Sequence, residues 1–246
     1  MVFKFVGKII PKPLKPTIKL VNSKMPSVIT VPLKEAMEIE FQRNFVKQFQ
    51  SNPDVIREDW EVNHSLKQIV DICQINDNTK VLDVGCGISS VLHFIKGDRF
   101  GIDPLADKYH KIYQYPSGIK VTNGSGEKIP FPDNYFDVVF SSNALDHCVS
   151  PKKTIDGIYR VLKSSGYFIL SVEVFPHSNP RGFEHPHTFT KNYVRSLVGG
   201  KFRTVFEKGT EMKDISKRTV NGEEEYYLSD TSNPVEEITL LLRKNG

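Results

Sequence analysis

From residue 80 onward, short apolar segments of strand length alternate with segments of helical periodicity, and this alternation restricts the fold more than any other feature. Strands that alternate with helices predict a parallel sheet with helices on both faces. Two later segments, separated by the polar insert EEEYYLSDTSNP, predict strands that close the sheet. The expected strands are VLDV (81–84), RFGID (99–103), IKVT (119–122), FDVVFS (136–141), GYFILSVEVF (166–175), FRTVFEKGT (202–210) and VEEITLLLRK (235–244).

Helices are expected between these strands and before the first one. Ser150 is a favourable N-cap residue and Pro151 suits the first helical position, so a helix is expected to begin there; Thr190 predicts another helix start. The apolar spacing predicts the remaining helices at about 32–49, 63–73, 89–96 and 105–113. We therefore divide the chain into a basic arm (1–34), a helical extension (35–74) and one α/β domain (75–246).

The charge of the chain is concentrated at its start. Residues 1–34 contain seven lysines and no acidic residue, whereas the rest has more acidic than basic residues, which disfavours nucleic acid as a partner. Prolines at 11, 13 and 16 interrupt any continuous amphipathic helix, so the arm is either a solvated segment packed on the body or a contact to an anionic membrane or an acidic partner. Three widely spaced cysteines indicate free thiols and a cytoplasmic protein.

Glycines follow the first expected strand in the segment VLDVGCGISS. Gly85 and Gly87 can adopt backbone angles that other residues avoid and leave room for a ligand at the carboxyl end of the strand. Asp103 ends the second strand and is placed to bind both hydroxyls of a ribose. Ser89 replaces the third glycine of a dinucleotide site, so the pattern favours a nucleoside over a nicotinamide dinucleotide, and an oxidoreductase is the weaker hypothesis.

Together with FGIDP and GSGEKIPFPDNYFDVVFSSNALDH, this segment resembles the class I S-adenosylmethionine-dependent methyltransferases of the small-molecule type, the methyltransferase domain family 11. The likeness covers about residues 75–175. It implies a Rossmann-like fold: a seven-stranded, mostly parallel sheet with helices on both faces and an antiparallel closing strand. It also implies S-adenosyl-L-methionine as the cofactor.

The resemblance also implies residue roles. Asp83 would hold the amino group of the cofactor, Gly85 and Gly87 would let its methionine part lie against the turn, and Asp103 would hold the ribose. The remaining implied contacts are Pro104, Ser125 and Gly126 at the adenine and Asn143 beside the methyl-donor sulfur. Ser125 stands where the family has an acid, so its hydrogen bond to the adenine is expected to be weaker.

Methyl transfer requires alignment of the donor and the acceptor and, for an alcohol or amine, removal of a proton. His147 is the best placed base, although relatives often have a histidine here regardless of substrate, which favours a structural role. The loop at 176–189 is either an acceptor-binding lid, with His185, His187 and Phe189 as contacts, or a polar surface loop. A metal site at its histidines lacks a second ligand cluster, so no metal is expected.

The expected function is therefore transfer of a methyl group to an oxygen, less favourably to a carbon or nitrogen, of a small-molecule, glycan or lipid-linked acceptor. The basic arm favours an acceptor made at a membrane. The alternative is a non-catalytic module that binds S-adenosylmethionine within a biosynthetic complex. The two hypotheses separate if the cofactor binds and no acceptor receives a methyl group.

Overall fold

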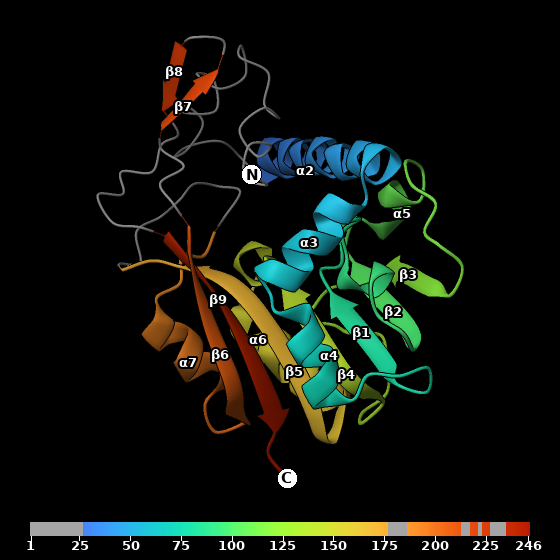
Figure 1. The fold of residues 1–246 in the computed structure, drawn as a ribbon. Helices are drawn as coiled ribbons and strands as arrows, with labels where there is room; N and C mark the ends of the chain where they lie inside the picture. The colour runs from blue at the N-terminus through green and yellow to red at the C-terminus, as the bar shows by residue number, and fades with distance from the viewer. Residues whose placement is uncertain (1–26, 177–185, 213–216, 221–222, 227–234) are drawn as a thin grey trace.

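The structure, a computed structural model, describes residues 27–176, 186–212, 217–220, 223–226 and 235–246 (Figure 1). Its centre is a seven-stranded sheet with the strand order β3-β2-β1-β4-β5-β9-β6. The strands are β1 (Lys80–Val84), β2 (Asp98–Asp103), β3 (Ile119–Asn123), β4 (Phe136–Ser142), β5 (Leu162–Val174), β6 (Phe202–Met212) and β9 (Val235–Lys244). The first five strands in this order are parallel, and β9 is antiparallel to both of its neighbours, which confirms the predicted fold class.

The strand order reverses at β1, which pairs with β2 on one side and with β4 on the other. Val81 and Leu82 are fully buried, as expected for a central parallel strand that is covered on both faces. Open sheets bind ligands where the order reverses, at the carboxyl ends of the strands. The fold therefore predicts a ligand-binding site at the loops that follow β1, β2 and β4.

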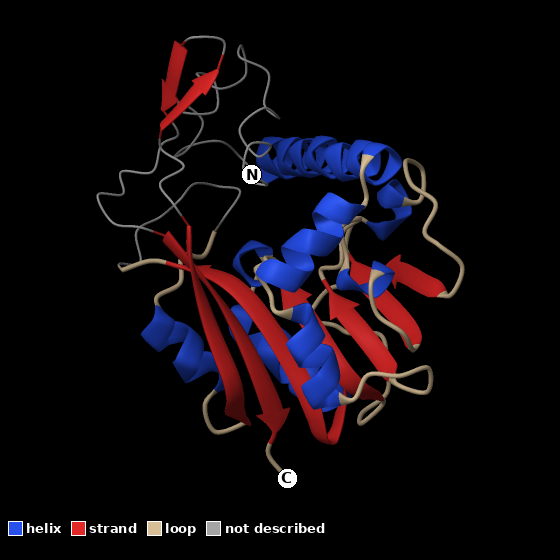
Figure 2. Ribbon diagram, in the orientation of Figure 1, coloured by secondary structure: helices blue, strands red, loops and turns tan. Residues whose placement is uncertain are grey.

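Helices cover both faces of the sheet (Figure 2). On one face, Ile155 and Ile158 of α6 (Pro151–Val161) share a core with Val194 of α7 (Lys191–Val198). On the other face, Trp60 of α3 (Asp54–Val62) and Ile69 of α4 (Leu66–Cys73) belong to a second core. The long α2 (Ser27–Ser51) lies above α3 in Figure 1 and is linked to α5 (Ala106–Tyr109) by the Glu35–Lys108 ion pair.

Two predicted helix starts are confirmed. The hydroxyl of Ser150 accepts a hydrogen bond from the backbone N–H of Lys153, and the hydroxyl of Thr190 accepts one from that of Tyr193. Each cap of this kind contributes about 1 kcal/mol. These caps fix the points at which the chain leaves the carboxyl edge of the sheet and enters α6 and α7.

Three helix predictions need correction. The segment 89–96 forms only a 3-10 helix, Val91–His93, because Ser90 caps its start and Gly97, at a positive φ, turns the chain into β2. The helix predicted over 105–113 ends as an α-helix at Tyr109. The helix predicted over 63–73 begins only at Leu66, since Ser65 has a left-handed backbone, and the preceding α3 was not predicted.

The polar insert between β6 and β9 contains two short paired strands, β7 (Lys217–Val220) and β8 (Glu223–Tyr226). Residues 1–26 of the predicted basic arm lie outside the described residues. Of the helices in the described ranges, none has the length and apolar character required to cross a membrane.

Candidate active site

In the glycine turn, residues 85–87, both glycines lie close to side chains of other segments. Gly85 and Gly87 have φ of +74° and +49°, in the left-handed region that favours glycine. A Cβ atom on Gly85 would lie 2.3 Å from the Cβ of Ala144, in the loop after β4. The turn is held to β2 by a hydrogen bond of 2.8 Å from the Gly85 N–H to the carbonyl of Ile102. The turn thus connects β1, β2 and the loop after β4.

Asp83, the next-to-last residue of β1, carries an unused hydrogen-bonding atom. Its Oδ2 accepts a hydrogen bond of 2.7 Å from the hydroxyl of Ser90. Its Oδ1 is buried and has no hydrogen-bond partner among the described residues. Burial raises the pKa of Asp83 to about 7, although the bond from Ser90 lowers it. A buried oxygen without a partner is costly and is well suited to a ligand ammonium group.

Asp103, at the end of β2, is fixed by backbone donors. Its Oδ2 accepts from the N–H of Gly87 at 3.2 Å, and its Oδ1 accepts from the N–H of Leu105 at 2.9 Å. Burial raises the pKa of Asp103 to about 6, against the effect of these two bonds and of a hydrogen bond from the Tyr109 side chain. A carboxylate has about four acceptor positions, so Asp103 can still accept a hydrogen bond from a ligand hydroxyl.

Helix α2 reaches the glycine turn through Gln42, which the sequence analysis did not identify. The Oε1 atom of Gln42 accepts a hydrogen bond of 2.7 Å from the N–H of Ile88. Its Nε2 donates to Glu38 and lies 2.8 Å from the position of a Cβ on Gly87. Gln42 is buried at 6% exposure, so the helical extension forms one wall of the site.

The residues predicted at the adenine lie on two loops. Pro104 is exposed at the end of β2. Ser125 and Gly126 follow β3, and a Cβ on Gly126 would lie 2.4 Å from a side-chain carbon of Thr154 in α6. Ser125 is hydrogen-bonded to Glu127, whose Oε1 accepts the N–H groups of Val149 and Ser150. Glu127 thereby ties the loop after β3 to the start of α6.

The residues predicted for the acceptor occupy the segments after β4 and β5. His147 is partly exposed, with its Nε2 atom 3.8 Å from Oδ1 of Asp146. The Nε2 atom of His187 lies 3.0 Å from the carbonyl oxygen of Cys148. Phe189 is 1% exposed, stacked with His187 and part of the core under α7. His185 lies outside the described residues, as do His177, Asn179, Arg181 and Glu184.

A second group of polar side chains lies beside the glycine turn, and of its members only Asn143 was predicted from the sequence. Asn143 is exposed and has φ of +47°, and its Nδ2 donates to Oε1 of Glu237 on β9 at 3.3 Å. His64, between α3 and α4, is buried and lies 3.7 Å from the same carboxylate. Neither Glu237 nor His64 belongs to a local sequence motif.

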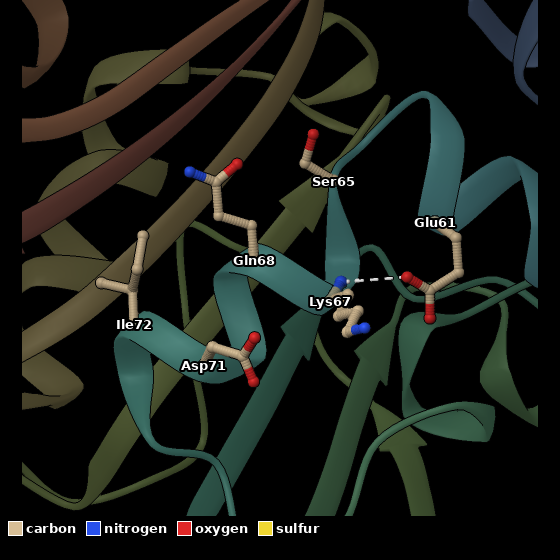
Figure 3. A pocket seen from close by; sticks show the side chains of 6 residues that line it. All are labelled: Glu61, Ser65, Lys67, Gln68, Asp71 and Ile72. Atoms are coloured by element: carbon tan, nitrogen blue, oxygen red, sulfur yellow. Dashed lines mark hydrogen bonds between the residues drawn. The ribbon is translucent and has the colours of Figure 1, made fainter.

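A pocket of about 360 Å³ lies elsewhere, on the outer side of α4 (Figure 3). Most of its lining side chains are exposed. It is lined by Glu61, Ser65, Lys67, Gln68, Asp71 and Ile72. None of these residues contributes to the glycine turn. A search of the described residues finds no cluster of three or more His, Cys, Asp or Glu side chains that could bind a metal ion.

Known proteins resemble this chain in sequence and fold. Residues 82–170 match the family model Methyltransf_11, a methyltransferase domain. The sarcosine/dimethylglycine N-methyltransferase of Aphanothece halophytica is 28% identical over 171 residues, which cover 63% of this chain and 61% of that protein. The sterol 24-C-methyltransferase ERG6B of Gibberella zeae is 34% identical over 104 residues, which cover 38% of this chain and 27% of that protein.

The chain thus spans less than two thirds of the length of these curated relatives. The solved structure of an S-adenosylmethionine-dependent methyltransferase from Methanosarcina mazei has the same fold, with a TM-score of 0.53 and 17% identity. The aligned region covers 72% of this chain and 97% of that one.

S-adenosylmethionine fits the residues that surround the glycine turn. The unpartnered oxygen of Asp83 matches its ammonium group, and the carboxylate of Asp103 can accept a hydrogen bond from its ribose. Residues 82–170 therefore match a methyltransferase domain family, and the chain has the Rossmann-like fold of solved S-adenosylmethionine-dependent methyltransferases.

Proposed function

We propose that the protein is a methyltransferase that uses S-adenosyl-L-methionine to methylate an oxygen atom of a small-molecule, sugar or lipid-linked acceptor. The observation that carries this proposal is the pair of buried carboxylates, Asp83 and Asp103, on either side of the glycine turn. The cofactor supplies an activated methyl group on a sulfonium. Its ammonium group would be held by Asp83 and its ribose by Asp103, so that its two ends are fixed by one rigid edge of the sheet.

The acceptor would bind on the other side of the turn, over the ends of β4 and β5. Its alignment with the donor and the removal of its proton are the tasks of the protein. His147 lies in the loop after β4, which supports an acceptor that must lose a proton, such as a hydroxyl group. Nitrogen and carbon acceptors are less favoured, although the names of the two relatives include one of each.

The location and partners belong to the same proposal. All three cysteines are free, which supports a cytoplasmic protein. The seven lysines of residues 1–34 support a peripheral contact with an anionic membrane, where a lipid-linked acceptor would be found. Nucleic acid is not proposed as a partner, and a non-catalytic role within a complex remains the competing hypothesis.

The direct test incubates the full chain with methyl-labelled S-adenosylmethionine and an extract of the source organism, and then separates the aqueous and organic phases. We expect protein-dependent label in the organic phase for a lipid-linked acceptor and in the aqueous phase for a soluble one. Binding of S-adenosylhomocysteine without any transfer of label would instead support the non-catalytic hypothesis.

The same assay tests His147. If it is the base, His147→Ala lowers the rate of transfer at least a hundredfold and leaves the affinity for S-adenosylhomocysteine within a factor of two, since general base catalysis contributes about 10²–10⁴. A rate close to that of the unmodified protein would assign His147 a structural role.

A further inference from the structure

Beside the glycine turn, buried polar side chains gather on the face of the sheet that α3 covers. The Nδ1 atom of His64 lies 3.1 Å from the hydroxyl oxygen of Ser171 on β5 and 3.4 Å from that of Thr239 on β9. The same atom lies 3.7 Å from Oε1 of Glu237. His64 is 4% exposed and Glu237 is 7% exposed. Side chains with these charges are seldom buried unless they are paired, so the group requires an explanation.

This polar group is connected to the candidate cofactor site at two points. Asn143 donates to Glu237, and Ala144, the next residue, is the closest neighbour of the Gly85 Cβ position. On the other side, the ring of Trp60 lies 4.6 Å from that of His64, and its Nε1–H donates to the carbonyl of Ser89 at 3.0 Å. The group therefore borders the glycine turn along both β4 and α3.

The strands that carry this polar group indicate whether it lies next to the cofactor or next to the acceptor. Asp83 and Asp103 lie on β1 and β2. The ribose and the amino-acid part of the cofactor would therefore be held at the ends of these two strands. The polar group lies on β4, β5 and β9, on the other side of β1 from β2. Asn143 is exposed, and its amide reaches the buried Glu237. A reactant beside Asn143 would therefore also lie close to the carboxylate of Glu237.

We propose that Glu237, rather than His147, is the group that accepts the proton of the acceptor, that it faces the point of methyl transfer beside Asn143, and that His64 positions and tunes it. This inference rests on the proposed function. In the step, a lone pair of the acceptor oxygen forms the new bond to the methyl carbon, and the electrons of the broken carbon–sulfur bond remain on sulfur. The O–H proton moves to the carboxylate of Glu237.

The surrounding charges suit this role. Burial raises the pKa of Glu237, the charge of His64 lowers it, and Asp59 on α3 and Glu173 on β5 raise it further. Asp59 also lies 3.7 Å from Nε2 of His64, so the histidine has a carboxylate on each side. A carboxylate with a raised pKa is a stronger base than an exposed one, and general bases work best when their pKa approaches the working pH.

The test compares the affinities of two cofactor analogues and needs no acceptor. Sinefungin carries an ammonium group on carbon in place of the methylated sulfonium, whereas S-adenosylhomocysteine is neutral at that atom. A carboxylate that faces the point of methyl transfer favours the binding of sinefungin, because opposite charges attract strongly away from bulk water. Asp83 and Asp103 meet groups that the two ligands share, so their contributions cancel in the ratio of the two dissociation constants.

We expect Glu237→Gln to reduce the preference for sinefungin at least fivefold. The matched control is Glu236→Gln, which removes the same charge one residue away, where the carboxylate is paired with Lys191. This control should leave the ratio unchanged. Equal ratios for both variants, with both proteins folded, would overturn the assignment of Glu237.

The unmodified protein provides an independent measurement should Glu237→Gln not fold. Its preference for sinefungin should increase as the pH rises through the raised pKa of Glu237, because the carboxylate then becomes charged. His64→Gln should move this increase to higher pH, since His64 lowers the pKa of Glu237. A ratio that does not vary between pH 4 and 8 would contradict the proposal. Binding of neither analogue would instead refute the proposed function.

Discussion

The two sides of the glycine turn hold their buried carboxylates by different means. On the cofactor side, Asp103 is bonded to backbone N–H groups of Gly87 and Leu105. On the acceptor side, Glu237 is contacted by the side chains of Asn143 and His64. A backbone donor persists whatever side chain its residue carries, whereas a side-chain donor is lost in one substitution. The backbone bonds to Asp103 are therefore specified by the fold, whereas the contacts of Glu237, like the bond from Ser90 to Asp83, depend on single side chains.

Gly85→Ala is expected to change a free energy more than any other substitution below. It tests the contact between the glycine turn and the loop after β4. The new methyl group would overlap Ala144 and also force a positive φ on a non-glycine residue. Overpacking costs about 1–3 kcal/mol and the backbone strain about 1 kcal/mol more. We expect urea unfolding to give a loss of about 2–4 kcal/mol in the free energy of unfolding.

Gly200→Ala is the matched control for this variant. Gly200 has φ of +79°, close to that of Gly85, but no atom lies within 4 Å of its Cβ position. In Gly200→Ala the free energy of unfolding should fall only by the cost of the strained backbone, about 1 kcal/mol. Equal losses in the two variants would show that the contact between the turn and the loop after β4 does not constrain the site.

Asp103→Ala is expected to have the second largest effect, and it tests whether Asp103 binds the ribose of the cofactor. Removal of the carboxylate should weaken the binding of S-adenosylhomocysteine at least tenfold, or about 1.4 kcal/mol, because the ribose would lose a hydrogen-bond acceptor. Titration calorimetry measures the affinity. Asp107→Ala, at an exposed position on α5, is the control and should bind normally. An unchanged affinity in Asp103→Ala would remove the ribose assignment.

The smallest expected effect is the pH dependence of cofactor binding. The pKa of Asp83 is raised to about 7, so this carboxyl group is largely protonated at pH 6 and largely ionised at pH 8. A ligand ammonium group favours the ionised form, so the affinity for S-adenosylhomocysteine should increase with pH, by about fivefold over this range. Asp83→Asn should remove most of the dependence. A pH profile identical in the variant would exclude Asp83 as the partner of the ammonium group.

The same difference between the two sides explains what could be predicted from the sequence. Asp83, Gly85, Gly87 and Asp103 occupy one strand–turn–strand unit, so their spacing carries the information about the site. The sheet followed from the alternation of strands and helices. The lengths of the two short helices did not, because they are set by capping at Ser90 and by the turns that follow α5.

The acceptor side has no equivalent local pattern. His64 and Glu237 are 173 positions apart in the chain and meet only because β9 is inserted beside β5 and α3 covers that face. Gln42 is one of many polar residues on α2, and only the position of this helix over the turn distinguishes it. Residues of this kind can be found only once the tertiary contacts are known.

The position of β9 also bears on how the protein folds. This strand follows β6 in the sequence but lies between β5 and β6 in the sheet. The sheet therefore cannot be completed by adding strands in the order of synthesis, and the insertion of β9 is a non-local step, of the kind that slows folding. Because Glu237 enters with this strand, an incompletely folded chain can assemble the β1–β2 side of the sheet but lacks the group proposed to accept the proton.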